Sequence, residues 1–142
     1  GLENAVFFGC DGTFGTDFLN RAGENAEGSY HATPRTPPQT PEKTAFDEAY
    51  KAAYGVGPGE LSPFTWNSYD CTTAIIEKVG DVAVLGEDGA LYIPRGALVD
   101  AVRGLDNWTG ISGTYTCAPV GDCNVQGPQF HIVENGAFVP VN

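Results

Sequence analysis

Hydrophobic residues lie in short runs and helical repeats, separated by turns rich in glycine and proline. Near the start, the apolar run 5–8 ends at Gly9 and predicts a buried strand of a parallel sheet. A short helix over 16–22, ended by Gly23, and a second strand over 28–33 follow. Strand, helix and strand in this order predict one βαβ unit.

The next segment predicts an extended connection and a helix. Prolines are concentrated between Pro34 and Pro41, which excludes a helix or a central strand there. Thr40 then supplies a capping hydroxyl, and Pro41 is suited to the first helical position. Apolar residues three and four positions apart continue this pattern and predict an amphipathic helix that ends near Gly55.

A further helix is expected after residue 66, with Asn67 or Ser68 as its cap. Its apolar face is predicted to contain these residues: Cys71, Ile75, Ile76 and Val79. Two short extended segments follow, over 83–85 and 90–93.

A last helix opens at Pro94 and stops at Gly104. The residues expected to face inward on this helix are Ala97, Leu98, Ala101 and Val102.

The end of the chain predicts strands and a tight hairpin. A strand over 113–116 leads into a turn, and Asn135-Gly136 between apolar alternations is a strong signal for a β-hairpin. The whole pattern predicts an α/β fold: a three-layer αβα arrangement around a parallel, Rossmann-like or flavodoxin-like sheet, with a C-terminal hairpin.

Composition narrows the possible functions. The 142 residues carry a formal net charge of -11, which argues against a nucleic-acid partner and against docking on anionic lipid. The chain has no nucleophile elbow, no phosphate-binding loop and no zinc-like spacing of cysteine and histidine. The sequence therefore predicts no catalytic residue, no metal site and no cofactor.

The chain has four cysteines, and whether they form disulfides indicates whether the protein folds in an oxidising compartment. Cys117 and Cys123 flank a turn with proline and glycine and form the best candidate disulfide, which would indicate an oxidising compartment; two unpaired thiols are the alternative. Cys10 and Cys71 could pair with each other, or each could be a small apolar residue in a segment expected to be buried.

Asp11 is the strongest candidate for a residue that binds a ligand. It follows the first predicted strand in the turn Gly9-Cys10-Asp11-Gly12, and open α/β sheets bind ligands at the carboxyl ends of their strands. A carboxylate there can hold an ammonium or hydroxyl group. The alternative is that Asp11 only caps the turn or the following helix.

An aromatic cluster near a helix start is the second candidate. Phe64, Trp66 and Tyr69 could line a small-molecule site, with ring faces for apolar contact and a hydroxyl for direction. The alternative is ordinary packing of the helix entry.

Four segments together resemble the C-terminal part of a type I periplasmic solute-binding protein of the branched-chain-amino-acid (leucine) ABC importers. They are Phe7–Gly12, Ala26–Tyr30, Tyr69–Lys78 and Leu91–Leu98. The loop over 113–123 is similar to that of a subset of the family, with its cysteine pair. The resemblance implies two α/β lobes joined by three crossings, with a ligand clamped between them.

The resemblance also implies a division of the chain. Residues 1–33 match the end of the second lobe, and 34–41 cross to the first lobe. Residues 42–110 supply helices and short strands of the first lobe, and 111–142 contain another crossing, the cysteine loop and the terminal hairpin.

The implied function is capture of a small extracellular solute, an amino acid or related amide or organic acid, for delivery to a membrane permease without catalysis. Asp11 stands where the family has an acid for the ligand's ammonium, with Cys10 and Gly12 beside it. Tyr69 stands where an aromatic residue borders the cleft, with Phe64 and Trp66 near it. The implied location is periplasmic or extracellular, with a lipid anchor as one arrangement of the full-length protein.

Two other functions remain open at this point. The same fold could sense a ligand in a regulatory or receptor domain, or the chain could be a small flavodoxin-like enzyme or receiver-type domain with Asp11 as its acid. Because the resemblance covers only the C-terminal part of the family, we also expect unpaired strand edges and a homo-oligomer or swapped dimer.

Overall fold

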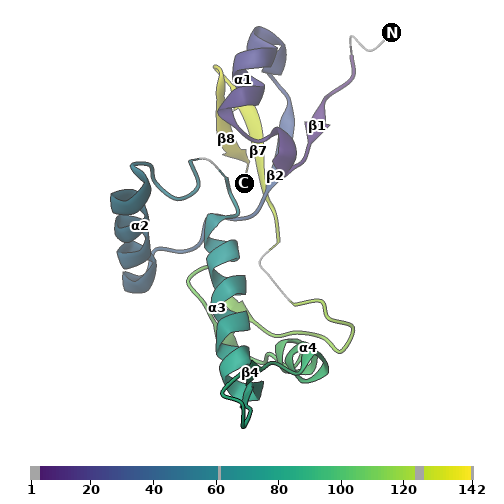
Figure 1. The fold of residues 1–142 in the computed structure, drawn as a ribbon. Helices are drawn as coiled ribbons and strands as arrows, with labels where there is room; N and C mark the ends of the chain where they lie inside the picture. Colours follow the sequence, from purple (N-terminus) through teal and green to yellow (C-terminus); the bar gives the residue numbers. More distant parts are fainter. Residues whose placement is uncertain (1–3, 61, 124–126, 142) are drawn as a thin grey trace. The chain divides into compact units, whose positions relative to one another are not determined.

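The computed structural model describes residues 4–60, 62–123 and 127–141 and shows a mixed α/β fold (Figure 1). The chain divides into two compact units. Unit 1 comprises Gly1–Thr36, Tyr50–Phe64 and Gln126–Asn142, and unit 2 comprises Pro37–Ala49 and Thr65–Val125. The assignment of chain segments to two lobes stays a prediction.

Unit 1 contains a four-stranded sheet in the order β1-β2-β7-β8. Its strands are β1 (Phe8–Gly9), β2 (Tyr30–Thr33), β7 (Gln129–Glu134) and β8 (Ala137–Val141). Only β1 and β2 are parallel, whereas β7 is antiparallel to both of its neighbours. The described sheet is therefore small and mixed rather than the parallel sheet expected, because the terminal hairpin supplies half of its strands.

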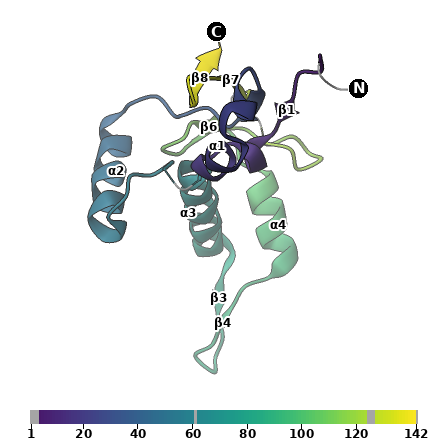
Figure 2. The ribbon, with the colours of Figure 1, turned by 90° about the horizontal axis from the view of Figure 1, so that it is seen from above.

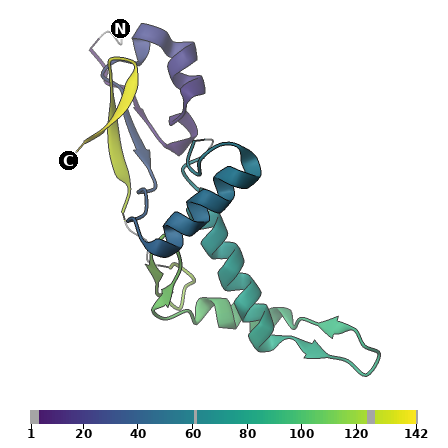
Figure 3. The ribbon, with the colours of Figure 1, turned by 90° about the vertical axis from the view of Figure 1, so that its left-hand side faces the viewer.

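The predicted βαβ unit is present. Helix α1 (Thr16–Ala22) has the predicted bounds and ends at Gly23, whose φ of 54° suits glycine. The short 3-10 helices η1 (Asp11–Thr13) and η2 (Gly23–Ala26) flank it. In unit 1, α1 lies along the sheet (Figure 3), and Phe18 of α1 contacts the ring of His31 at 4.8 Å between centroids.

The first strand differs from the expectation of a buried run. Strand β1 has only two residues, and the side chains of Val6, Phe7 and Phe8 are 66%, 50% and 57% exposed. The reason is its position: β1 is the edge strand of the described sheet, with a neighbour on one side only.

The terminal hairpin forms where Asn135-Gly136 predicted it. Both turn residues have positive φ, 54° and 71°, as a two-residue hairpin turn of this type requires. The carboxylate of Glu27 accepts hydrogen bonds from the backbone N–H of Asn135 at 3.0 Å and of Gly136 at 2.6 Å. This contact ties the turn to the loop that precedes β2.

Two histidines stand opposite each other in the sheet of unit 1. His31 on β2 pairs with His131 on β7, and His31 is fully buried. Thr13 Oγ1 lies 2.9 Å from His31 Nδ1, and Ser29 Oγ lies 3.0 Å from His31 Nε2. Burial, with a smaller contribution from the charge of His131, lowers the pKa of His31, and burial also lowers the pKa of His131.

We expect these histidines to make stability depend on pH. Because their pKa values are lower in the folded state, the unfolded chain binds protons more tightly. Their contribution to the free energy of unfolding is fully present above the unfolded-state pKa of about 6.5 and is lost as the pH falls through the folded-state values. Urea unfolding from about pH 8 to pH 5 should show this decline, and His131→Phe should make it shallower. If the free energy of unfolding of His131→Phe depends on pH as steeply as that of the parent chain, the decline does not come from these histidines.

Unit 2 is built on helices α3 (Thr65–Val82) and α4 (Arg95–Arg103), which lie side by side (Figure 2). Helix α2 (Pro41–Tyr54) begins and ends as predicted, and Thr40 Oγ1 accepts a hydrogen bond from the Lys43 N–H at 3.1 Å. Residues 41–49 of α2 belong to unit 2 and 50–54 to unit 1. Helix α4 also has its predicted extent.

Helix α3 begins earlier and buries a different face from the one expected. It starts at Thr65, so Asn67 and Ser68 lie inside the helix. Its buried residues are Trp66, Asp70 and Ala74, four positions apart. The face predicted to be buried is largely exposed: Cys71 is exposed, and Ile75 and Ile76 are 46% and 65% exposed.

Two short antiparallel pairs complete unit 2. One consists of β3 (Val84–Leu85) and β4 (Leu91–Tyr92), and the other of β5 (Trp108–Thr109) and β6 (Thr114–Tyr115). The first forms the connection between α3 and α4, as Figure 2 shows. Of the residues expected to face inward on α4, Leu98, Ala101 and Val102 are half-buried, but Ala97 is exposed.

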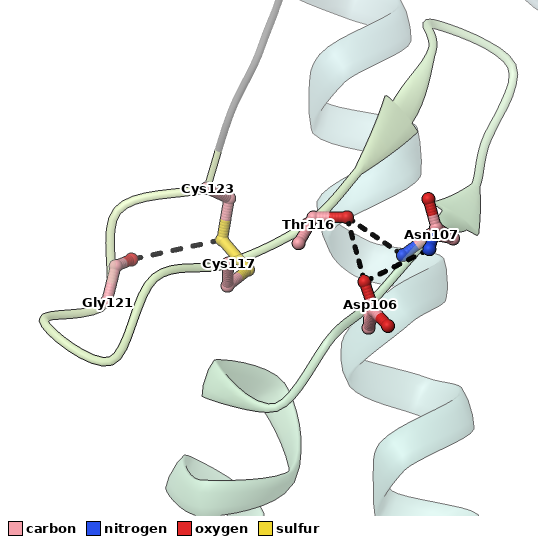
Figure 4. The surroundings of a disulfide bond; sticks show 6 residues. All are labelled: Asp106, Asn107, Thr116, Cys117, Gly121 and Cys123. Atoms are coloured by element: carbon pink, nitrogen blue, oxygen red, sulfur yellow. Dashed lines mark hydrogen bonds between the residues drawn. A yellow bond between two sulfur atoms is a disulfide. The ribbon is translucent and has the colours of Figure 1, made fainter.

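The predicted disulfide joins Cys117 and Cys123 (Figure 4). Beside it, Thr116 Oγ1 accepts a hydrogen bond from the Asn107 N–H at 2.9 Å and donates one to Asp106 at 3.2 Å. Cys10 and Cys71 are unpaired and exposed, so neither the pairing nor the burial considered for them is found.

Within the described ranges, no helix combines the length and the apolar character needed to cross a membrane.

Candidate functional site

The turn that contains Asp11 follows directly after β1, at the carboxyl end of that strand. Cys10 and Asp11 are exposed, and Asp11 opens the 3-10 helix η1. The N-cap residues of η1 and α1 are Cys10 and Gly15, and neither caps its helix with a side chain, so both readings of Asp11 stay predictions. A Cβ atom at Gly12 would meet nothing within 4 Å, which shows that the turn is open on this side.

The aromatic candidates have different surroundings. Trp66 is 7% exposed, and its Nε1 donates to Asp47 Oδ1 at 2.7 Å. Lys43 lies with its Nζ 4.7 Å from the Trp66 ring and pairs with Asp47 at 2.6 Å. Trp66 is thus held in a packed cluster with both charges, which favours the packing alternative for this residue. Phe64, in unit 1, is 40% exposed.

Tyr69 is the most accessible aromatic candidate in unit 2. It is 45% exposed, and its ring centroid lies 4.7 Å from that of Phe46. It lines a cavity of about 370 Å³. The same cavity is also lined by Glu42, Thr73, Glu77, Trp108 and Thr109. The volume is within the range of small-molecule sites.

Asp70 lines this cavity and binds the neighbouring turn that forms part of its wall. The Asp70 side chain is almost fully buried. Its carboxylate accepts hydrogen bonds from the backbone N–H of Ile111 at 2.8 Å and of Ser112 at 2.7 Å, and also from the Ser112 hydroxyl. These donors belong to the turn between β5 and β6. A Cβ atom at Gly110 would collide with the same carboxylate, so glycine is needed for this close approach.

Tyr115 adds a further polar contact to the hydrogen bonds around the Asp70 carboxylate. Its hydroxyl is hydrogen-bonded to Ser112 Oγ and lies 3.4 Å from Asp70 Oδ2. Burial raises the pKa of the Tyr115 phenol, and the negative charge of Asp70 acts in the same direction. The hydroxyl therefore stays protonated at neutral pH and can donate to its oxygen neighbours.

The sequence did not identify the other residues of the cavity beside Tyr69. Trp108 Nε1 donates to Glu77 Oε2 at 2.7 Å, across 31 positions of sequence. Nothing local in the sequence links these two residues. For Asp70 there was a signal: an acid stands between the apolar residues Trp66 and Ala74 at helical spacing.

The structure therefore places the predicted ligand contacts in both units. Cys10, Asp11, Gly12 and Phe64 belong to unit 1, and Trp66 and Tyr69 belong to unit 2. Exposed carboxylate and aromatic groups are suited to binding a small polar molecule.

Comparisons with known proteins support a fold assignment. No family model matches the chain, and no curated protein matches its sequence. Among solved structures, a leucine-binding protein from Thermotoga maritima is similar over 98% of this chain and 37% of its own, with a TM-score of 0.71 and 22% identity.

Other solved structures agree with this match. An extracellular ligand-binding receptor from Rhodopseudomonas palustris covers 98% of this chain (TM-score 0.65, 24% identity), and the match covers 41% of the receptor. An ABC transporter substrate-binding protein from Desulfitobacterium hafniense, in complex with Leu, covers 89% (TM-score 0.58, 21% identity) and is itself covered to 39%.

The chain thus spans well under half the length of these proteins. Within the described residues, four α-helices and a small mixed sheet give the chain the fold of part of a type I periplasmic binding protein.

Proposed function

We propose that the chain is the ligand-capturing part of a solute-binding protein that serves an ABC importer and has no catalytic activity. The observation that carries this proposal is the fold match over 98% of the chain to a leucine-binding protein. The match to a substrate-binding protein solved with Leu supports an amino acid, or a related amide or organic acid, as the solute. The protein would capture the solute in the periplasm or outside the cell and deliver it to a membrane permease.

In this proposal the protein has a three-layer αβα arrangement, and the chain crosses between its two lobes at residues 34–41 and near residues 110–123. Asp11, exposed at the end of β1, binds the ligand's ammonium group, with Cys10 and Gly12 beside it. Tyr69 supplies an exposed aromatic face. Phe64 stays a candidate contact, and self-association of the chain stays a prediction.

The proposal is tested by thermal unfolding of the chain with leucine, isoleucine or valine added in excess. A ligand that binds the native state raises the melting temperature, and a concentration one hundred times the Kd adds about 2.7 kcal/mol. Asp11→Asn should remove the increase because the ammonium loses its partner.

Asp17→Asn is the matched control, since Asp17 is exposed on α1 and pairs only with Arg21, at 3.3 Å, among the described residues. We expect this variant to keep the ligand-induced increase. If leucine and its relatives, and a wider panel of amino acids, amides and organic acids, leave the melting temperature unchanged, the proposal is wrong.

A receptor role is the second candidate, favoured by the similarity to an extracellular ligand-binding receptor. The two functions differ in what lies downstream of binding. Genes for a permease and an ATPase beside the gene for this chain would favour import, and genes for a kinase or regulator would favour sensing.

A further inference from the structure

We infer that the cavity beside Tyr69 is a binding site for a small organic cation, of which a quaternary ammonium is the best-fitting class. The inference goes beyond the proposed function, because it rests on unit 2 alone and shares only Tyr69 with the residues proposed for the amino acid. It is carried by three properties of one cavity of about 370 Å³: the sign of its charges, its aromatic walls and its hydroxyl groups.

The charge on the cavity wall is negative. Glu42 comes from the first turn of α2 and Glu77 from α3, and both side chains are exposed. Asp70 also lines the cavity, but its oxygens are used by the turn at 111–112. No lysine, arginine or histidine is among the described residues that line it. The chain's net charge of -11 adds a long-range attraction for cations.

The aromatic walls favour a cation that carries methyl or methylene groups. Tyr69 and Trp108 both line the cavity, and aromatic faces attract ammonium groups within about 6 Å of the ring centroid. The bond from Trp108 Nε1 to Glu77 Oε2 at 2.7 Å fixes the indole next to a carboxylate. The ring and the negative charge are therefore presented together, the combination that aromatic cages use for choline-type ligands.

The remaining lining explains why a bare metal ion fits less well. Thr73 and Thr109 offer hydroxyl groups that can bond to a polar tail, and the cavity is much larger than a hydrated-ion site needs. Hard cations also prefer several converging oxygens at short range. Within the described residues, no group of three or more acidic, cysteine or histidine side chains is arranged to hold a metal ion.

The experiment uses choline as the probe and two-dimensional NMR of the two indole N–H groups, those of Trp66 and Trp108. Choline should move the Trp108 resonance in a saturable way and leave that of the buried Trp66 nearly unchanged. The neutral isostere 3,3-dimethylbutan-1-ol has the same shape without the charge, and we expect it to bind at least about tenfold more weakly.

Two variants test the carboxylates. Glu77→Gln keeps an oxygen acceptor for Trp108 but removes the charge, and Glu42→Gln removes the second charge. Each should weaken choline binding by about tenfold. The matched control is Glu87→Gln in the exposed turn between β3 and β4, which should leave binding unchanged.

The inference is overturned if the Trp108 resonance does not respond to choline, if both probes bind equally, or if neither carboxylate variant weakens binding while the Trp66 resonance shows an intact fold. Asp11→Asn separates this site from the proposed function: it should abolish the response to leucine and leave the choline response intact. A chain that binds choline but no amino acid would therefore refute the proposed function and keep this inference.

Discussion

Replacement of Asp70 by alanine is expected to lower the free energy of unfolding of the chain by roughly 3 to 5 kcal/mol. The carboxylate is buried and accepts bonds from two backbone N–H groups and a hydroxyl. Without it, the Ile111 and Ser112 donors lose a charged acceptor, and the turn between β5 and β6 loses its link to α3. Urea unfolding followed by tryptophan fluorescence measures the loss.

Two further variants make this result specific. Asp70→Asn retains one oxygen acceptor and should lose less stability than the alanine variant. Asp81→Ala removes an acid from the same helix, but its ion pair with Lys78 at 2.8 Å is at the surface, where such pairs contribute little. Equal losses for Asp70→Ala and Asp81→Ala would mean that the buried Asp70 carboxylate contributes no more to stability than an acid at the surface.

The second large effect is expected for Gly110→Ala. The added methyl group would overlap the Asp70 carboxylate, so either the turn or the carboxylate must shift. Forcing extra volume into a packed site costs roughly 1 to 3 kcal/mol, and here hydrogen bonds are also lost. Unfolding in urea should show this loss. Gly96→Ala on α4 is the control, because a Cβ there meets nothing within 4 Å.

The two substitutions should not be additive. In the Asp70→Ala background the atoms that the new methyl group would hit are absent, so Gly110→Ala should cost much less than it does in the parent chain. A double-mutant cycle measures this coupling directly. Additive losses would show that the methyl group at 110 is resisted by something other than the Asp70 carboxylate.

The elements that the sequence predicted well are those with local signals. Gly23 ended α1, Thr40 and Pro41 opened α2, and Asn135-Gly136 formed the terminal turn. In each case the backbone conformation is set by the residues within one turn of it. Contacts from distant segments, such as that of Glu27 with the terminal turn, add to conformations that these local residues already favour.

The burial of α3 could not be predicted in this way. The helix has apolar residues on more than one face, and the sequence suggested the face with Cys71 and Ile75. The observed face includes Asp70, which can be buried only because donors 41 and 42 positions away meet it. Such a partner is set by the tertiary fold and leaves no periodic signal.

The sequence predicted candidate contacts but not their surroundings. Asp11 and Tyr69 are exposed and stay predicted ligand contacts, whereas Trp66 is enclosed by Lys43 and Asp47. Glu77 and Trp108 were missed because their pairing spans two separate elements, α3 and β5. Aromatic and acidic residues at a helix start indicate a site, but they do not say which of them turn inward.

The contact between Glu27 and the terminal turn also bears on how the chain ages. An asparagine that precedes glycine loses its side-chain amide when the next backbone nitrogen attacks the side-chain carbon. In this turn that nitrogen, Gly136 N, donates its proton to Glu27 at 2.6 Å. Because this hydrogen bond helps to fix the Gly136 nitrogen in the hairpin, we expect deamidation of Asn135 to be faster when the turn opens locally.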